Sequence, residues 1–370
     1  MHRVLVVFGT RPEAIKMAPV VAELAAREGF EPIVAVTAQH REMLDQVLQL
    51  FDITPDYDLD IMKPGQTLAD ITLNSLSGLT PLMDRVRPSA VLVQGDTTTS
   101  FAAALAAFYH KVPVGHIEAG LRTGDIYSPY PEEMNRRLTT RLTRWHFAPT
   151  ATPAGHLLAE GVAASDITIT GNTVVDALLH VRALPYQFEA GSVESEAMIQ
   201  GKRIVLVTAH RRESWGEPMA NIFKAVRRIA ERFEDVHVFV ATHRNPIVSE
   251  PAHRILGGVE GVDLLGPLGY LPFVKLMDAA TLILSDSGGI QEEAPTLGKP
   301  ALVLREVTER PEAIEAGVVE LVGTDTERIV ERATRLLTDP VAYAEMAQPA
   351  NPFGDGTAAL QIVDVLEREL

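Results

Sequence analysis

Three carboxylates in the first half of the chain have the residue type and position for proton transfer. Asp96 follows the apolar run VLVQG, Glu118 follows VPVGHI, and Glu132 lies downstream in YSPYPEEMNRR. Two of them have ordinary structural alternatives, because Asp96 suits the cap of a helix beginning near Thr97 and Glu132, like Glu133, suits a first helical turn. Glu118 has no such alternative, since an acid that ends an apolar strand is oddly placed unless it meets a ligand. We therefore expect a general acid–base centre built from these three side chains.

A glycine-containing turn near the N-terminus has features of an anion site. The segment GTRPEAIK leads from an apolar run into a helical pattern, and the first turn of a helix offers free N–H groups. Arg11 and Lys16 add positive charge. An ordinary strand–helix turn with a solvated arginine fits the pattern equally well. The segment is neither a GxGxxG dinucleotide motif nor a Walker loop.

A second turn, in SDSGGIQEEAP, is a more specific candidate for a phosphate site. It passes from the apolar run TLIL into a Ser-Gly-Gly turn and a helix. Ser287, Gly288 and Gly289 would let the backbone close on a diphosphate. Glu293, one turn further, could accept hydrogen bonds from a ribose, whereas Glu292 is expected to be a solvated charge on the helix surface.

Two further loops of the second half supply titratable or cationic groups. His210, in AHRRE, suits contact with a diphosphate oxygen because an imidazole changes charge near neutral pH. Arg211 or Arg212 could bind phosphate or pair with Glu213. Arg310, in TERPEA, is a second candidate cation. The other histidines show no metal-ligand spacing, so no metal site is expected.

The elements that must position these groups follow one pattern twice. Apolar strand candidates alternate with helical stretches, which indicates βαβ units and parallel sheets. We expect two similar α/β domains over 1–182 and 203–350, joined within 183–202, and a final helix over 357–370 that packs back on the first domain. Ligands of such sheets bind beyond the carboxyl ends of the strands, so two facing domains would form an interdomain active-site cleft. The expected strands of the two halves are 3–8, 32–37, 90–94, 112–117, 167–170, 203–208, 236–241, 262–265, 281–285 and 301–304.

Composition excludes several classes of protein. The chain has 370 residues, 46% hydrophobic and 22% charged, as in globular proteins. A net charge of −16 disfavours nucleic-acid binding, so an anionic ligand would need local positive charge. The lack of cysteine excludes disulfides, thiolate metal sites and a catalytic thiol. No apolar run approaches the roughly 18 residues of a membrane helix, and MHRVLVVF is too short for a signal peptide, so no membrane insertion is expected.

The ordered set of motifs resembles the bacterial non-hydrolysing UDP-N-acetylglucosamine 2-epimerases over nearly the whole chain. The motifs are GTRPEAIKMAP, TAQHREMLDQVL, GDTTTS, HIEAGLRTG, PEEMNRR, GNTVVDAL, HRRES, SDSGGIQEEAPTLGKP, TERPEA and GTD. The resemblance implies two Rossmann-like domains in the GT-B arrangement. It also implies reversible conversion of UDP-GlcNAc to UDP-ManNAc without cofactor or metal, in a cytoplasmic homodimer that serves cell-surface polysaccharide synthesis.

The resemblance also assigns roles to residues. It implies a catalytic set of Asp96, Glu118, Glu132 and His210, and substrate contacts by Arg11, Lys16, Phe273 (uracil), Ser287, Gly288, Gly289 (diphosphate), Glu293 (ribose) and Arg310. An allosteric UDP-GlcNAc site would involve Gln39, His40 and Gln66.

Two positions depart from the family pattern. Leu268 stands where a close pattern has Gln, so a side-chain amide contact to uracil is absent, and Gly65 replaces an Arg of some members in the allosteric loop. Three other functions stay open at this point: a GT-B glycosyltransferase, a hydrolysing epimerase and a nucleotide-sugar-binding regulator. The three carboxylates favour the epimerase, because a retaining transferase needs no bases on both faces of carbon 2.

Overall fold

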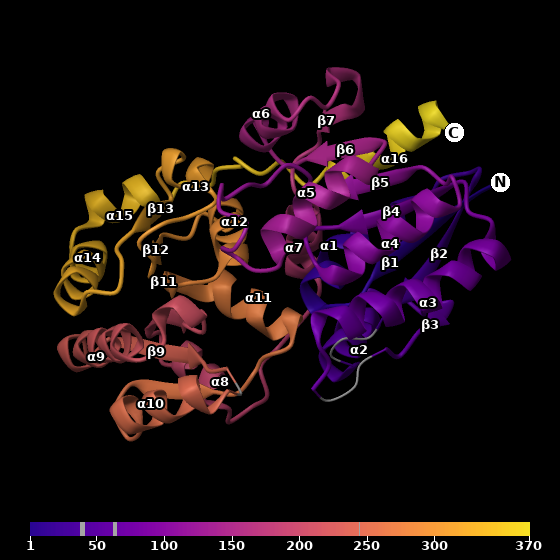
Figure 1. Cartoon of the computed structure of the whole chain (residues 1–370). Coiled ribbons are helices and arrows are strands. Elements are labelled where there is room, and N and C mark those ends of the chain that lie inside the picture. Colours follow the sequence, from indigo (N-terminus) through magenta and orange to yellow (C-terminus); the bar gives the residue numbers. More distant parts are fainter. Residues whose placement is uncertain (38–40, 62–64, 244) are drawn as a thin grey trace. The chain divides into compact units, whose positions relative to one another are not determined.

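The computed structural model describes residues 1–37, 41–61, 65–243 and 245–370 (Figure 1). The chain forms two compact units. The first comprises residues 1–179 and 353–370, and the second comprises residues 180–352. Each is an α/β unit built on one parallel sheet, as the alternating sequence pattern predicts.

The first unit contains a seven-stranded parallel sheet in the order β3-β2-β1-β4-β5-β6-β7. Its central strands are rich in valine and leucine, as is typical of a sheet covered on both faces. The strands are β1 (His2–Phe8), β2 (Phe30–Val36), β3 (Tyr57–Asp58), β4 (Ala90–Gln94), β5 (Val114–Ile117), β6 (Trp145–Ala148) and β7 (Ile167–Ile169).

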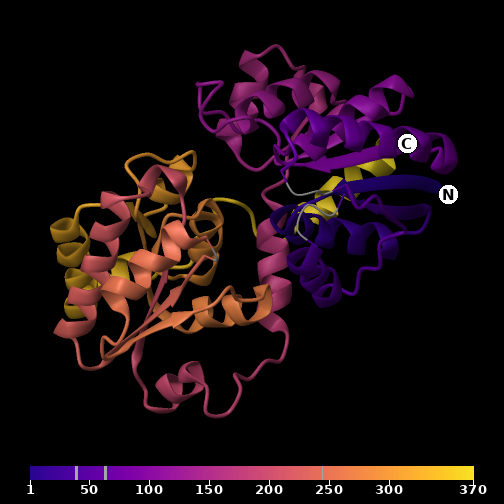
Figure 2. The same ribbon diagram turned by 60° about the horizontal axis from the view of Figure 1, so that its bottom comes forward.

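Helices cover both faces of this sheet. Helices α3 and α4 pack on each other and on β1, β4 and β5, and α5 packs on α4. Helix α1 packs against β1, α2 and the C-terminal helix α16, which lies among the N-terminal elements in both views (Figures 1 and 2). The helices of this unit are α1 (Arg11–Ala26), α2 (Arg41–Leu50), α3 (Leu68–Val86), α4 (Thr98–Tyr109), α5 (Glu132–Leu142), α6 (Ala151–Ala159), α7 (Thr173–Ala183, whose last residues belong to the second unit) and α16 (Ala358–Glu369).

The second unit contains a six-stranded parallel sheet in the order β10-β9-β8-β11-β12-β13. Helices α9, α10 and α14 bury their apolar faces on one side of it, and α11 and α12 pack on the other. The strands are β8 (Arg203–Thr208), β9 (Val236–Ala241), β10 (Val262–Leu265), β11 (Ala280–Ser285), β12 (Ala301–Val303) and β13 (Val319–Leu321). The helices are α8 (Val193–Ile199), α9 (Glu217–Arg232), α10 (Pro246–Leu256), α11 (Tyr270–Ala279), α12 (Gly288–Leu297), α13 (Pro311–Glu315), α14 (Thr326–Thr338) and α15 (Pro340–Met346).

Both sheets have the strand order of a Rossmann fold. Numbered within each unit, the first six strands run 3-2-1-4-5-6, and the first unit adds a seventh strand beside the sixth. The direction of winding therefore reverses between β1 and β4 and again between β8 and β11. Ligands of such sheets bind beyond the carboxyl ends of the strands at these reversals. The loops that the sequence singles out follow these four strands or lie beside them, so the expected Rossmann-like architecture is confirmed.

Several short elements were not anticipated from the sequence. Strands β3, β6 and β13 have only two to four residues, too few to show a period. The segment expected to join the domains contains helix α8, although its composition shows little helical periodicity.

Candidate functional site

The first anion-type loop is held by a buried glutamate. Thr10 is the N-cap of α1 and forms a capping box with Glu13, which places Arg11 as the first residue of the helix. Oε2 of Glu13 accepts hydrogen bonds from the backbone of Gly9 (3.0 Å) and from the backbone and hydroxyl of Thr10 (both 2.8 Å). Gly9 is required here by space, because a Cβ would lie 2.1 Å from Oγ1 of Thr37.

The same glutamate also holds the loop that follows β4. Its Oε1 accepts hydrogen bonds from Oγ of Ser100 (2.9 Å) and Oγ1 of Thr97 (2.6 Å). Burial raises the pKa of Glu13, and these hydroxyl and N–H donors oppose that shift by stabilising the carboxylate. Glu13 therefore joins the loop that carries Arg11 to the loop that carries Asp96.

Asp96 is paired with a cation and is not a helix cap. Thr97 is the N-cap of α4, so the alternative role considered for Asp96 is wrong. Arg136 of α5 donates to Oδ2 of Asp96 from Nε (2.9 Å) and Nη2 (2.6 Å). Asn135 fixes the backbone carbonyl of Asp96 at 2.9 Å. The guanidinium stabilises negative charge on Asp96 and fixes the position of its carboxylate.

Glu118 lies at the end of β5 in a left-handed backbone conformation with φ 65°. Such a conformation is costly for a residue with a side chain and is often found at functional sites. Nζ of Lys16 lies 2.7 and 2.6 Å from the two carboxylate oxygens, and both side chains are largely buried. Gln94 also donates to Glu118, and Asn172 does so at 3.4 Å. Lys16 thus pairs with a predicted catalytic residue.

Glu132 is the first residue of α5. Its Oε2 is buried and has no hydrogen-bond partner among the described residues. Glu132 precedes Arg136 by one helical turn, so the two side chains lie on one face of α5, and Arg136 binds Asp96. Asp96 and Glu118 follow adjacent strands, since Gln94 pairs with Ile117. The structure therefore gathers the three predicted carboxylates at one edge of the first sheet.

Glu133, the neighbour of Glu132, has a structural role. It is fully buried and accepts hydrogen bonds from Nη1 of Arg136 (3.1 Å), Nε of Arg137 (3.0 Å) and the backbone of Thr123 (3.1 Å). It therefore fixes the guanidinium that holds Asp96.

His116, in β5, supports the same edge of the sheet as a neutral side chain. Burial lowers its pKa to about 4. Its Nε2 lies 2.7 Å from the carbonyl oxygen of Gly95, so the neutral imidazole donates there and holds the turn that precedes Asp96.

The second unit places His210 directly beyond the end of β8, beside Asp286 at the end of β11. Oδ2 of Asp286 accepts hydrogen bonds from the backbone of His210 (2.7 Å) and Arg211 (2.8 Å). Nδ1 of His210 lies 3.2 Å from Oδ1 of the same carboxylate. The ring of His243 stacks on the imidazole with centroids 6.1 Å apart.

The predicted diphosphate loop precedes α12. Ser287 is the N-cap of this helix, and its backbone N–H donates to Oγ of Ser285 at 3.0 Å. Arg310 lies against Gly288, where a Cβ would stand 2.9 Å from Nη1. Arg310 also binds Oε1 of Glu292 at 2.6 Å. The prediction that Glu292 is a solvated surface charge is therefore wrong, because it is buried and holds Arg310 beside the Ser-Gly-Gly turn.

Glu293 and Phe273 lie near the same helix. Glu293 is buried, and its Oε1 accepts a hydrogen bond from the hydroxyl of Tyr270 at 2.7 Å. Phe273 is a half-buried residue of α11, one turn after Tyr270.

Arg305, at the end of β12, links two loops of this edge. It binds Glu213 of the His210 loop at 2.7 Å and Glu309 at 3.0 Å. Glu213 thus pairs with Arg305, an arginine that the sequence did not single out. Burial opposes the charge of Glu309, but Arg305 and Arg310 outweigh it and lower its pKa to about 2.

The expected allosteric residues are only partly visible. Gln39 and His40 lie outside the described residues. Gln66 donates from Nε2 to the carbonyl of Ile61 at 2.6 Å, and its buried Oε1 has no hydrogen-bond partner within the described part of the chain.

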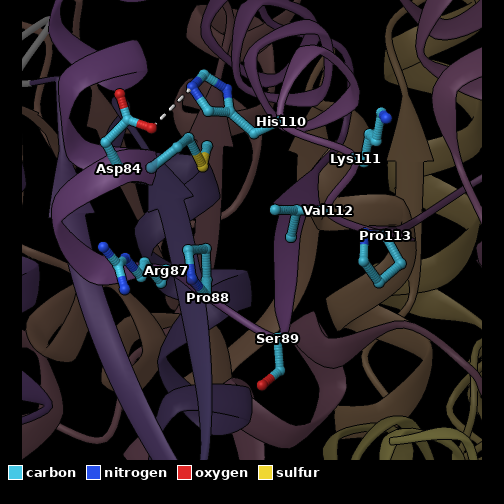
Figure 3. A pocket seen from close by; sticks show the side chains of 9 residues that line it. Asp84, Arg87, Pro88, Ser89, His110, Lys111, Val112 and Pro113 are labelled. Carbon is cyan, nitrogen blue, oxygen red and sulfur yellow. Dashed lines mark ion pairs between the residues drawn. The ribbon is translucent and has the colours of Figure 1, made fainter.

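A separate hollow of about 640 Å³ lies at the opposite edge of the first sheet (Figure 3). Ser89 and Pro113 line it, just before β4 and β5, whereas the candidate residues follow those strands. Nε2 of His110 lies 3.6 Å from the exposed Asp84 across this hollow. Its position separates it from the candidate site.

Metal-binding clusters and membrane-spanning helices are both absent from the described residues. Residues 1–37, 41–61, 65–243 and 245–370 contain no group of three or more acidic or histidine side chains that could hold a metal ion. Over the same ranges, no helix combines the length and apolarity needed to cross a membrane.

Several site residues escaped the sequence analysis. They act as partners of the predicted ones: Gln94, Arg136, Asn172, Asp286 and Arg305. Gln94 and Asp286 directly follow or end a strand, as the predicted residues do, and this signal could have found them. Arg136 and Asn172 carry no comparable local signal.

Comparison with known proteins agrees with this geometry. A family model described as UDP-N-acetylglucosamine 2-epimerase matches residues 22–367. The UDP-N-acetylglucosamine 2-epimerase of Yersinia pestis is 55% identical over 369 residues, which cover 99% of this chain and 98% of the relative. The crystal structure of the UDP-GlcNAc 2-epimerase from Neisseria meningitidis bound to UDP-GlcNAc matches with a TM-score of 0.92 and 50% identity, covering 99% of this chain and 100% of that one. The glycotransferase of kitacinnamycin, at 13% identity and a TM-score of 0.66, shares the fold alone.

Two Rossmann units, one with clustered carboxylates and the other with a diphosphate-type turn, define an α/β enzyme of nucleotide-linked substrates. Within that class, the chain belongs to the UDP-N-acetylglucosamine 2-epimerase family.

Proposed function

We infer that the protein interconverts UDP-GlcNAc and UDP-ManNAc by eliminating UDP to give 2-acetamidoglucal and adding it back. Family membership supports the reaction. The observation that carries the mechanism is the carboxylate cluster at the edge of the first sheet. In this cluster Asp96 and Glu118 each have a cationic partner, and Glu132 has a buried oxygen with no hydrogen-bond partner among the described residues.

The chemistry explains why more than one carboxylate is needed. The hydrogen on carbon 2 is not acidic, because the acetamido carbonyl cannot stabilise a carbanion there. Cleavage of the C1–O bond, with its electron pair leaving on UDP, gives an oxocarbenium-like centre that acidifies this hydrogen. The hydrogen is anti to UDP in the gluco sugar and syn in the manno sugar, so proton-transfer groups are needed on both faces.

We assign the proton transfers to Asp96 and Glu132, one ionised while the other is protonated. Arg136 binds and positions the carboxylate of Asp96. The buried oxygen of Glu132, which has no hydrogen-bond partner within the described part of the chain, supports contact with substrate. Glu118, charge-paired with Lys16, would stabilise positive charge at carbon 1.

The second unit would hold the UDP part. Ser287, Gly288 and Gly289 offer backbone N–H groups at the start of α12, and Arg310 lies against them. Further assigned contacts of this unit are His210 to diphosphate, Glu293 to ribose and Phe273 to uracil. Arg11, a residue of the first unit, is also assigned to diphosphate. Sequestration of the glucal until re-addition would limit its release with UDP.

The test is proton NMR of the purified protein with UDP-GlcNAc in heavy water. UDP-ManNAc with deuterium at carbon 2 of both sugars is expected. Free ManNAc with UDP would instead identify a hydrolysing epimerase. An unchanged substrate would contradict both and direct attention to glycosyl transfer or ligand sensing.

We also propose that the protein acts as a cytoplasmic homodimer, as the family resemblance implies. Support for a protein partner comes from the exposed apolar side chains of the layer α3–α5: Leu73, Phe108, Tyr109 and Leu138. Light scattering during gel filtration should give twice the chain mass, and Phe108→Glu should lower it. A monomeric wild type would overturn the proposal.

Activation by UDP-GlcNAc at a second site is a separate proposal. Its support is the family resemblance and the buried oxygen of Gln66, which has no hydrogen-bond partner among the residues that the structure describes. A sigmoidal dependence of rate on UDP-GlcNAc that becomes hyperbolic in Gln66→Ala is expected. Hyperbolic kinetics in the wild type would contradict it.

A further inference from the structure

Asp286 is a carboxylate that the proposed reaction does not use, although it lies against His210. Its side chain is fully buried, whereas the imidazole of His210 is 39% exposed. The two residues come together because β8 and β11 are neighbours with Thr208 opposite Ser285. The backbone N–H of Asp286 donates to the carbonyl of Thr208 at 3.2 Å, which continues this pairing one residue beyond the sheet.

The two oxygens of this carboxylate are used differently. Oδ2 accepts two backbone N–H groups, from His210 and Arg211, and so fixes the course of the loop. Oδ1 is buried, and no described residue makes an aligned hydrogen bond to it. Nδ1 of His210 lies 3.2 Å from this oxygen. A small rotation of the imidazole would therefore complete a hydrogen bond to an oxygen that lacks one.

We propose that Asp286 is a positioning residue for His210. Its carboxylate accepts a hydrogen bond from Nδ1–H of the imidazole, so that Nε2 faces the departing diphosphate. This inference rests on the proposed contact of His210 with that diphosphate. When the C1–O bond breaks, its electron pair leaves on the β-phosphate oxygen of UDP. The Nε2–H of the imidazolium donates a hydrogen bond to that oxygen and keeps its proton. Asp286 stabilises the cation from the other side of the ring.

The charges around His210 support this role. Burial lowers the pKa of His210, Asp286 opposes this effect, Arg211 and His243 add to it, and Glu213 opposes it. Removal of the Asp286 charge would therefore disfavour the imidazolium further. The ring of His243 lies nearly parallel to the imidazole, at an interplanar angle of 15° and a centroid distance of 6.1 Å.

The test is a double-mutant cycle with Asp286→Asn and His210→Gln. Asp286→Asn should lower kcat roughly 10- to 100-fold, the size of one hydrogen bond to a charged group, and shift the alkaline limb of the kcat profile to lower pH. In the His210→Gln background the same change should have little further effect, because the two residues act as one unit. Equal losses in both backgrounds, or an unshifted pH profile, would overturn the proposal.

Two further measurements show whether a loss of activity in Asp286→Asn is merely structural and whether His210 has the proposed role at all. Ser285→Ala is a matched control, because it removes the contacts of Oγ with Thr208 (2.6 Å) and with the backbone N–H of Ser287 (3.0 Å) at the same strand ends without touching the imidazole. It should change kcat without shifting the pH profile. A fully active His210→Gln would refute the proposed role of His210, and with it the positioning role of Asp286 that rests on it.

The NMR spectrum of the imidazole nitrogens can be recorded on the wild-type protein, so this test does not depend on the folding of a variant. Only the assignment of the His210 signal needs one, His210→Gln. The neutral ring is expected to carry its proton on Nδ1. A neutral ring protonated on Nε2 would overturn the proposal directly.

Discussion

Glu13 in the first unit and Asp286 in the second occupy comparable places, but the oxygens of the two carboxylates have different partners. Each is a buried carboxylate at the reversal of its sheet, and each accepts two backbone N–H groups of the loop that follows the first strand of its unit. Both oxygens of Glu13 are fully used by hydroxyl and N–H donors. Asp286 keeps one oxygen for an imidazole.

This difference separates two uses of the same feature. A carboxylate that is saturated by neutral donors can only hold two loops together. A carboxylate that keeps an oxygen beside a titratable ring also affects the charge and orientation of that ring. Accordingly, we expect proton transfer to depend on the carboxylate cluster of the first unit and leaving-group stabilisation to depend on His210 and Asp286.

The largest effect is expected for Glu132→Gln. An amide cannot accept the carbon 2 proton, so kcat should fall roughly 10²- to 10⁴-fold, the usual contribution of a general acid or base. Deuterium incorporation at carbon 2 should fall equally. UDP affinity, measured by calorimetry, should stay unchanged because Glu132 is not among the residues assigned to UDP. Normal turnover in both directions would refute the assignment.

Glu13→Gln should have an intermediate effect. Its amide NH₂ would face N–H and hydroxyl donors, so urea unfolding should show a loss of about 2 kcal/mol. The rate should fall because Arg11 and Asp96 are displaced, but the pH profile should keep its shape. Glu13→Asp keeps the carboxylate but shortens the side chain, so it tests whether a negative charge alone is enough to hold the two loops. A shifted profile in Glu13→Gln would remove the contrast with Asp286.

Asp176→Asn should affect stability alone. Asp176 of α7 accepts the backbone N–H of Ala359 at 2.9 Å, and burial raises its pKa to about 6. The folded protein therefore binds this proton more tightly than the unfolded chain, whose value is about 4. The resulting stability is present below about pH 4 and is lost as the pH rises to about 6, by roughly 3 kcal/mol. The variant should lack this part of the pH dependence, with kcat unchanged. An identical pH dependence in both proteins would be the contrary result.

The smallest effect concerns His116. Its pKa of about 4 keeps it neutral at ordinary pH, so its NMR signal should not move between pH 5.5 and 8. The His210 signal should move with pH, and its change should extend to the acid side of the ordinary histidine range because burial lowers the pKa of His210. A moving His116 signal would mean that the first unit also contains a titrating imidazole.

The sequence predicted the parts of the site that a strand end can reveal. Asp96, Glu118, His210 and Ser287 follow apolar runs, and a parallel sheet brings such positions to one edge. Glu292 was misjudged because its position in the helix says nothing about Arg310, which arrives from a later loop. Arg136 was missed for the same reason, since its pairing with Asp96 is a tertiary contact across 40 positions.

The return of the chain to the first unit has a consequence for its synthesis. Helix α16 packs on α1, and Arg27 binds Asp364 and Glu367 at 2.9 and 2.7 Å. These partners leave the ribosome after the whole of residues 180–352. The second unit can therefore complete its contacts while the first still lacks a covering helix. During translation, the first unit therefore begins to form before the second unit but is completed after it.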